Sequence, residues 1–345
     1  MGSLLELHIN STAQGKNASI PITNILSCVV FLMTFLFGLV VNNLYLWIIG
    51  FKMYKSINST WFFHLISTNS VFTLTMPFVA VYLLMSPNWI MGYFLCKLIN
   101  SMVSLCVYAN VLFLTVISLD RHTFVFYPIW YRRHMTHRRA SAICFAVWGL
   151  SMVSSSPYFA FRQIRLLDDN ETTICYNDYS LTGKWDNEQK AIVQMKWLLF
   201  SFRLVLCFLL PFSVITVCYL KIALKMKKGN LVKSSKPYKI IFIAVTSFFL
   251  SFIPYHLWYG MSIEEGIFRE TTLNGLKLLA TCLACFHYCF TPVLYLFIAE
   301  NFKKTLRKSI LSLIESVFSE AFNSWNKGFD ENRSGTNDKS QEDTT

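Results

Sequence analysis

Seven long apolar segments constrain this chain more than any other feature of its sequence. A bilayer core is about 30 Å thick, so a helix needs about 20 apolar residues to cross it. The segments cover residues 26–51, 61–85, 94–126, 140–161, 195–224, 238–262 and 273–298. Charged residues make up only 14% of the 345 residues, well below the roughly 25% of soluble domains. The sequence therefore predicts an all-α membrane protein built as a seven-transmembrane helix bundle.

The basic residues predict how the bundle is oriented. Lys and Arg gather in the connections after the first, third and fifth segments and after the seventh, whereas most acids lie in the other connections. Cytoplasmic loops carry the excess of basic residues, so segment 1–25 is expected outside and the C-terminus inside. The glycosylation sequons at Asn10, Asn17 and Asn170 then fall outside, where acceptor sites must lie. Because this topology accounts for the net charge of +12, we expect no nucleic-acid partner.

The residues after the last apolar segment divide into two predicted parts. Within 299–318, apolar side chains recur at helical spacing opposite Lys and Arg, which predicts an amphipathic eighth helix lying on membrane lipids. Segment 319–345 is polar and rich in Ser, Thr, Asn and acids, so we expect it to be disordered.

Two of the ten cysteines, Cys96 and Cys175, fall at the outer side, and the other eight lie inside predicted helices as small apolar residues. We expect Cys96 and Cys175 to be bonded to each other, since the outer compartment is oxidising. The remaining chemistry is sparse: the sequence has no Cys or His grouping with metal spacing and no visible pairing of a nucleophile with a base. We therefore expect neither a metal or cofactor nor an enzyme.

Several motifs occur in an order that carries a family resemblance. Asp120-Arg121 closes the uncharged run 101–119, and Cys96 precedes Arg121 by 25 positions. The others are Asn42 in GLVVNNLYLW, Trp148, Pro211 with Tyr219, Pro254 in FFLSFIPYH, and TPVLY at 291–295. Over residues 26–318 the chain resembles the rhodopsin-like (class A) G protein-coupled receptors. The stretches 74–78 (LTMPF), 126–134 (FYPIWYRRH) and 231–237 (LVKSSKP) are similar to the chemoattractant branch, which includes formyl-peptide receptors and their orphan relatives.

The resemblance implies a plasma-membrane receptor that passes an extracellular signal to a heterotrimeric G protein, by expectation of the inhibitory type. It also implies a receptor kinase and an arrestin acting on the Ser/Thr-rich tail. The residues that it assigns to coupling and switching are Asp120, Arg121, Tyr219, Phe252, Pro254, Thr291, Pro292 and Tyr295. Phe252 stands where relatives carry Trp, and His122 where they carry Tyr. These departures leave a second interpretation open, a non-signalling or arrestin-biased scavenger or decoy receptor of the same fold.

Three positions depart from the sodium site of relatives. Asn69, Asn110 and Thr291 stand where the resemblance implies a carboxylate and its partners. Hard cations prefer charged oxygen ligands, so the sequence predicts no functional sodium site. The alternative is a satisfied polar network with no signalling consequence.

Arg203 is the strongest ligand-binding candidate. It lies within apolar WLLFSFRLVLCFLLPF, and an arginine inside a membrane indicates a functional site unless its long stem lets it reach the interface. It matches an arginine that binds anionic groups in formyl-peptide receptors. Leu199 and Ser104 replace the second arginine and the acid of those receptors, so an acidic peptide or a lipid acid fits better than a formyl peptide. The predicted ligand-binding set is Arg203, Ser104, Tyr255, His256, Tyr259 and Thr281, of which the aromatic members could equally be packing residues.

Overall fold

The computed structural model describes residues 21–53, 55–167, 171–179, 189–228, 236–264 and 266–298, and the statements below concern this part of the chain. The chain divides into two compact units, Met1–Ile298 and Ala299–Thr345, and the described residues belong to the first. The predicted eighth helix, the tail and the sequons at Asn10, Asn17 and Asn170 lie outside the described residues.

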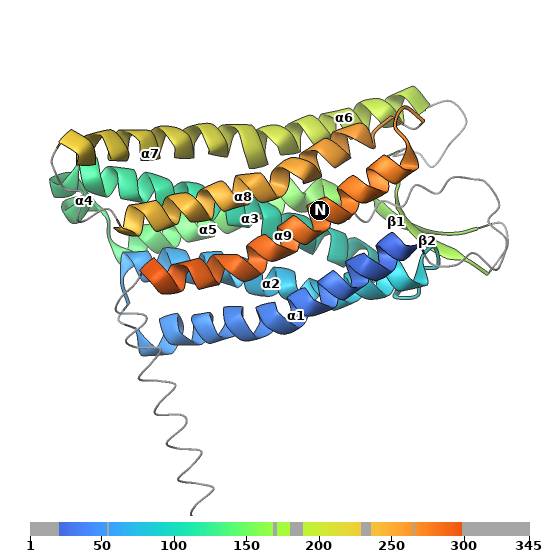
Figure 1. Ribbon diagram of the computed structural model, residues 1–345, viewed down its shortest axis with the longest axis horizontal. Coiled ribbons are helices and arrows are strands. Elements are labelled where there is room, and N and C mark those ends of the chain that lie inside the picture. Colours follow the sequence, from blue (N-terminus) through green and yellow to red (C-terminus); the bar gives the residue numbers. More distant parts are fainter. Residues whose placement is uncertain are drawn as a thin grey trace, which may run out of the picture. The chain divides into compact units, whose positions relative to one another are not determined.

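Long helices running side by side make up the described unit (Figure 1). In chain order they are α1 (Ile22–Trp47) with the π-helical turn η2 (Ile48–Lys52), α2 (Ile57–Met85), α3 (Gly92–Phe126), the short α4 (Pro128–His134), α5 (His137–Ala160), α6 (Gln189–Leu204) with the π-helical turn η3 (Val205–Leu209), α7 (Leu210–Lys228), α8 (Lys236–Met261) and α9 (Glu270–Ile298). Because α6, η3 and α7 follow one another without a break, they form one rod.

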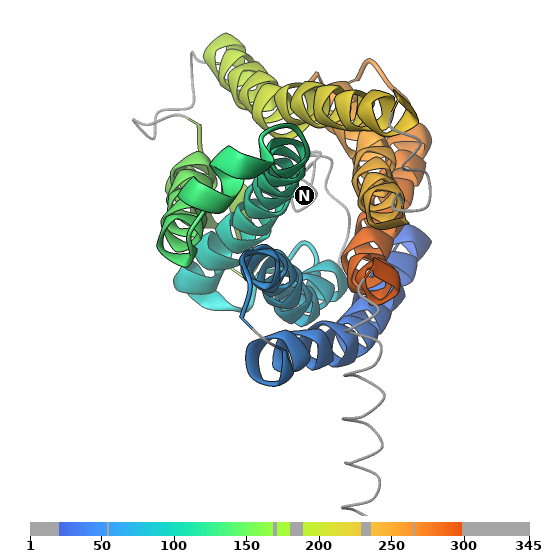
Figure 2. The same ribbon diagram turned by 90° about the vertical axis from the view of Figure 1, so that its left-hand side faces the viewer.

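These rods have the lengths and surfaces of membrane spans. Six stretches of the described residues, formed by α1 with η2, α2, α3, α5, α6 to α7, and α9, are long and apolar enough to cross a bilayer. The remaining rod, α8, packs against α9, and Figure 2 looks along the bundle and shows the rods beside one another. Large apolar side chains such as Phe145 and Val153 are 77% and 70% exposed. Apolar surface on this scale suits lipid rather than water.

Polar caps and internal prolines shape the rods locally. Ser56 and Ser59 form a capping box at the start of α2, with the Ser59 backbone N–H donating to the Ser56 hydroxyl at 3.1 Å. Prolines also lie inside four of the long helices, at Pro77, Pro157, Pro254 and Pro292. Neighbouring helices can satisfy the backbone groups that a proline frees, so such breaks are tolerated in membrane spans.

The turn η3 sits directly before Pro211. A proline removes a backbone donor, and its ring crowds the carbonyl four residues earlier. A π-helical turn, which bonds five residues apart, accommodates that crowding. The widened turn therefore sets how the last residues of α6, Arg203 among them, are aimed at the bundle.

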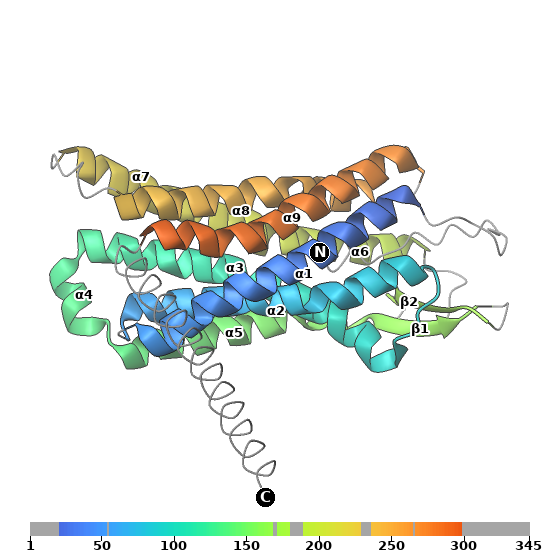
Figure 3. The ribbon, with the colours of Figure 1, turned by 60° about the horizontal axis from the view of Figure 1, so that its bottom comes forward.

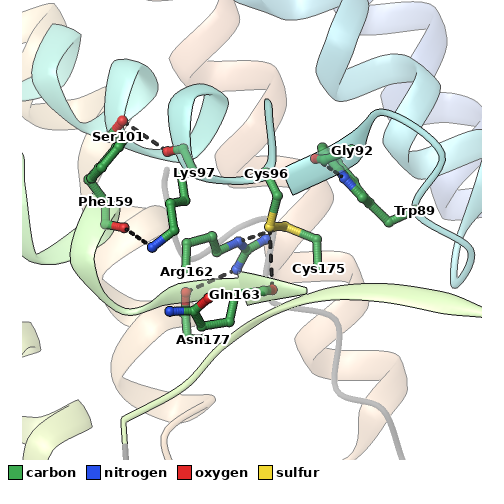
Figure 4. Close-up of a disulfide and its surroundings, with 10 residues drawn as sticks. All are labelled: Trp89, Gly92, Cys96, Lys97, Ser101, Phe159, Arg162, Gln163, Cys175 and Asn177. Atoms are coloured by element: carbon green, nitrogen blue, oxygen red, sulfur yellow. Dashed lines mark hydrogen bonds between the residues drawn. A yellow bond between two sulfur atoms is a disulfide. The ribbon is translucent and has the colours of Figure 1, made fainter. Parts of the chain in front are cut away.

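A two-stranded hairpin covers one end of the bundle, and α4 lies at the other; we call these the hairpin end and the α4 end (Figure 1). Strands β1 (Arg162–Leu166) and β2 (Thr173–Asn177) pair antiparallel, with Ile164 opposite Cys175. The predicted disulfide between Cys96 and Cys175 is confirmed, and it ties β2 to the first turns of α3 (Figure 4).

The hairpin end holds a buried, hydrogen-bonded arginine. Arg162 is 1% exposed, and its Nε donates to the Cys175 sulfur at 3.1 Å while its Nη1 donates to Asn177 Oδ1 at 3.1 Å (Figure 4). Nearby, the Trp89 backbone N–H donates to the Thr173 carbonyl at 2.6 Å. These bonds fix the hairpin over the ends of α2 and α3. A molecule that enters the bundle from the hairpin end must therefore pass beside this fixed hairpin.

Candidate functional site

One face of α3 carries polar groups that have no partner. Asn100, Ser104 and Tyr108 recur at four-residue spacing and therefore share a face of the helix. All three are buried, with exposed fractions of 1% or less. Both amide atoms of Asn100 and the Ser104 hydroxyl lack hydrogen-bond partners. Buried polar groups nearly always have partners in a native structure, so this face of α3 is a candidate ligand-binding surface.

Arg203, on the last turn of α6, is fully buried with an exposed fraction of 0%. None of its three guanidinium nitrogens has a hydrogen-bond partner. Three tyrosine rings surround it instead: the guanidinium carbon lies 5.7 Å from the ring centre of Tyr108, 5.2 Å from Tyr158 and 5.0 Å from Tyr255. The alternative that Arg203 reaches the membrane surface is therefore wrong, since the side chain points into the bundle.

The aromatic residues of α8 complete this cluster. Tyr255 packs on Arg203, and Tyr259 lies one turn further along the helix, with ring centres 6.1 Å apart. His256 is also buried, and its Nδ1 has no partner. We call Arg203, Tyr108, Tyr158, Tyr255, His256 and Tyr259 the arginine cluster.

Four of the six predicted ligand-binding residues lie together, namely Arg203, Tyr255, His256 and Tyr259. Thr281 instead lines a cavity between α1, α2, α3 and α9. Ser104 shares the face of α3 that carries Tyr108, one turn away along the helix. Sequence reasoning missed Asn100, Tyr108 and Tyr158. The four-residue spacing from Asn100 through Tyr108 was the signal for two of them, but Tyr158 follows a proline in another helix and gives no such pattern.

A fixed cation ringed by aromatic faces can bind an anion. The planar guanidinium offers paired donors that match a carboxylate or phosphate. Burying a charge without a hydrogen-bonded counter-ion is costly. The guanidinium of Arg203 therefore carries a desolvation cost that its tyrosine contacts offset in part and that a bound anion would offset further.

The α4 end holds the charged pair that the sequence singled out. The Arg121 guanidinium donates to Asp120 Oδ2 at 2.7 Å, and the Tyr131 hydroxyl of α4 donates to Asp120 Oδ1 at 2.7 Å. Arg121 also donates to Asn58 Oδ1 of α2. Burial and the bond to Asp120 raise the pKa of the Tyr131 hydroxyl above its ordinary value, so it stays a donor at neutral pH. Tyr219 packs instead against Phe242 of α8, with ring centres 5.9 Å apart.

A neutral network lies between the two ends. Asn110 Nδ2 donates to Asn69 Oδ1 at 2.7 Å and to the Thr68 hydroxyl at 3.2 Å. His287 Nε2 lies 3.4 Å from Asn110 Oδ1, and the Thr291 hydroxyl donates to the His287 carbonyl at 2.7 Å. The structure thus brings the three altered positions Asn69, Asn110 and Thr291 into one buried network that joins α2, α3 and α9.

The remaining switch candidates surround that network. Phe252 stacks on Phe248 with ring centres 4.5 Å apart and lies 5.9 Å from the His287 ring. Pro254 and Pro292 lie inside α8 and α9, and the side chain of Tyr295 lies outside the described part.

A bundle of membrane-spanning helices with a tethered hairpin, a buried polar cluster near that hairpin and a charged pair at the far end defines a seven-transmembrane receptor. The family described as 7 transmembrane receptor (rhodopsin family) matches residues 41–295, and the chain belongs to that family. It is therefore a multi-pass membrane protein of a receptor family and not an enzyme.

Relatives place the chain within that family. It is 39% identical to Probable G-protein coupled receptor 33 of Homo sapiens over 287 residues, 82% of this chain and 85% of the relative. It is 34% identical to the C3a anaphylatoxin chemotactic receptor of Oncorhynchus mykiss, over 91% of this chain and 84% of that receptor. With N-formyl peptide receptor 2 of Gorilla gorilla gorilla it shares 30% identity over 88% and 89% of the two chains. The predicted placement in the chemoattractant branch is confirmed.

Proposed function

We propose that this chain is a plasma-membrane receptor for an extracellular anionic chemoattractant, an acidic peptide or a lipid acid, that signals through a heterotrimeric G protein of the inhibitory type. The observation that carries the proposal is Arg203, a fully buried guanidinium whose three nitrogens have no partner. A buried cation in a membrane span is retained against a large cost, and a ligand carboxylate offsets that cost.

The site favours a single anionic group. Leu199 lies one turn before Arg203 on α6 and is itself buried, so an apolar side chain occupies the adjacent position. One guanidinium matches one carboxylate with two parallel hydrogen bonds. The C-terminal carboxylate of a peptide or the head of a lipid acid has this charge and shape.

The same geometry suggests how binding reaches the α4 end. The arginine cluster joins α3, α5, α6 and α8, and an anion bonded to Arg203 and to the α3 face draws these helices together. A ligand shifts a receptor between two states only through its different affinity for them. In the mechanism that we propose, α8 bends at Pro254, Arg121 leaves Asp120 and Asn58, and the opened cavity admits a helix of the G protein.

The proposal also includes the orientation of the receptor in the membrane and its regulation by a receptor kinase and an arrestin. The hairpin end and segment 1–25 face the cell exterior, with glycans on Asn10, Asn17 and Asn170, and the C-terminus is cytoplasmic. Segment 299–318 lies on the inner membrane face, and a receptor kinase phosphorylates segment 319–345 for recognition by an arrestin.

The test compares peptides that differ only at the C-terminus. Purified receptor in nanodiscs is mixed with an inhibitory-type G protein, and nucleotide exchange is measured with pairs of peptides ending in a carboxylate or an amide. We expect active carboxylate peptides to lose at least 100-fold in potency when amidated or when Arg203 is replaced by Met. Arg203→Lys should recover part of the response, since Lys keeps the charge but not the bidentate geometry. An unchanged dose-response in Arg203→Met refutes the assignment.

A scavenger or decoy receptor is the second candidate. It is favoured by the neutral network of Asn69, Asn110 and His287 and by Phe252 at the switch position. Arrestin recruitment by an active peptide without any nucleotide exchange would select this function over the first.

A further inference from the structure

A groove on the outside of the bundle lies at the hairpin end, between α6 and the turn that joins α8 to α9. Figure 3 shows that this turn lies at the same end as β1 and β2. The groove holds about 280 Å³ of space, and its described lining residues are Trp197, Gly260, Met261, Glu264, Ile267 and Phe268. We call it the Trp197 groove. Its rim is accessible, since Trp197, Ile267 and Phe268 are 39%, 61% and 41% exposed.

The indole of Trp197 is held in place by contacts on two sides. Its Nε1–H donates to Glu264 Oε1 at 3.3 Å, which joins α6 to the turn. The ring of Phe200 packs edge-on against the indole, with ring centres 5.6 Å apart. Gly260 leaves room for that ring, because a Cβ at this position would lie 3.2 Å from Phe200. The groove therefore presents an aromatic ring and a carboxylate in a fixed relation to each other.

The groove continues the apolar surface that faces lipid. Ile253, Leu257 and Met261 recur at four-residue spacing and therefore share one face of α8. Ile253 and Leu257 are 39% and 54% exposed, and Met261 lines the groove. On α6, Leu198 follows Trp197 and is 63% exposed. Because Trp is enriched at the boundary between lipid and water, we infer that the groove lies at the level of the lipid headgroups.

The chemistry of the groove favours a cation that carries apolar groups. Glu264 is exposed, and among the described lining residues it is the one with a charged side chain. A single carboxylate offers too few ligands for a hard metal ion, and a primary ammonium is strongly hydrated. A quaternary ammonium has methyl groups in place of N–H donors, and aromatic faces bind it. The carboxylate beside the rings of Trp197 and Phe268 therefore matches a trimethylammonium group.

We propose that the Trp197 groove binds the choline headgroup of a membrane lipid. The trimethylammonium lies against the Trp197 indole and the Glu264 carboxylate, and an acyl chain runs along Leu257 and Ile253. The acyl chain adds little preference, because the surrounding lipid tails are as apolar as the helix face. The headgroup therefore decides which lipid binds. The site requires neither the ligand nor the signalling that we propose above.

The test uses the full chain in nanodiscs of phosphatidylethanolamine and phosphatidylglycerol, which contain no choline. A phosphatidylcholine probe carries a diazirine at the start of one acyl chain, and labelled peptides are mapped by mass spectrometry. We expect saturable labelling of the segments around Leu198 and Leu257, at least threefold stronger than with matched ethanolamine and glycerol probes. Sphingomyelin, which shares the phosphocholine head but not the glycerol backbone, should compete with the probe.

Two substitutions test the two recognition groups. An exposed contact of a cation with an aromatic ring or with a carboxylate contributes a factor of about three. Trp197→Leu and Glu264→Gln should therefore each weaken probe binding about threefold, and the double variant about tenfold. Trp130→Leu in α4 and Glu270→Gln in α9 are the matched controls outside the groove, and both should leave labelling unchanged. Glu264→Lys should instead favour the phosphatidylglycerol probe, a new preference that an unfolded chain would not produce.

The other outcomes overturn the proposal. Equal labelling by the ethanolamine probe would show that the choline head is not selected. Labelling that is unchanged in the double variant would show unspecific contact with surrounding lipid. Displacement of the probe by a soluble arginine-rich peptide but not by sphingomyelin would assign the groove to a basic protein partner. Because no readout involves a G protein or Arg203, failure of the proposed function is distinguished from failure of this site.

Discussion

Replacing Arg203 by Met should stabilise the ligand-free receptor while abolishing its stabilisation by an anionic ligand. Each buried donor without a partner costs about 1–3 kcal/mol, and Arg203 has three such nitrogens. Each contact with a tyrosine ring returns about 0.5–2 kcal/mol, and three rings surround the guanidinium. Central values leave a net cost of about 2 kcal/mol that Met removes while keeping most of the packing of the arginine stem.

Thermal unfolding of the purified receptor measures this effect. For a chain of this size, about 2 kcal/mol corresponds to a rise in Tm of about 3 °C. An anionic ligand at 100 times its Kd should stabilise the native receptor by about 2.7 kcal/mol and the variant not at all. The order of the two melting temperatures should therefore reverse when ligand is added.

Arg162→Met is the matched control. Arg162 is equally buried, but it is hydrogen-bonded to Asn177 Oδ1 and to the Cys175 sulfur. Its loss leaves Asn177 without that donor, so this variant should unfold at a lower temperature in the same buffer. If Arg203→Met lowers the Tm as Arg162→Met does, the Arg203 nitrogens are satisfied without ligand, and the inference of an anion site from orphaned donors fails.

Two further predictions concern the switch. Asn58→Ala removes an acceptor that holds Arg121 on α2. It should raise basal nucleotide exchange about tenfold, the lower end of what one bond to a charged group contributes. Unchanged or lower exchange would show that this bond does not restrain activation. Replacing sodium by an organic cation should leave agonist affinity unchanged in competition binding. The reason is that Asn69 and Asn110 offer only neutral oxygens to a hard cation. A tenfold effect of sodium on agonist affinity would contradict this prediction.

The helices could be predicted from hydropathy because lipid demands uninterrupted apolar rods, but their ends could not. The segment expected at 61–85 begins at Ile57, since Ser56 and Ser59 cap the helix with polar side chains that hydropathy does not register. The hairpin and α4 carry no periodic apolar signal. They are held by tertiary bonds, the Cys96–Cys175 disulfide and the Tyr131–Asp120 hydrogen bond, which a single sequence does not reveal.

The candidate site could be predicted from the sequence where a residue type was unusual for its surroundings. It could not be predicted where membership of the site depended on which face of a helix a residue occupies. A single arginine within an apolar segment can be recognised from the sequence alone, so Arg203 was predicted. Which other residues lie beside Arg203 depended on helix faces: Thr281 lines a cavity between α1, α2, α3 and α9, while Tyr108 contacts the guanidinium. His287 became part of the central network only through its place between Asn110 and Thr291.

The widened turn η3 has a consequence for how positions are transferred between relatives. An ordinary helix rotates about 100° per residue, so a rod that accommodates one extra residue before Pro211 is out of phase with a regular rod on its far side. Counting back from the proline by regular steps places Arg203 about 100° away from the direction of the three tyrosines. Deleting one residue between Val205 and Leu209 would restore the regular phase and turn the guanidinium about 100° away from the three tyrosines, while every other residue of the arginine cluster stays the same.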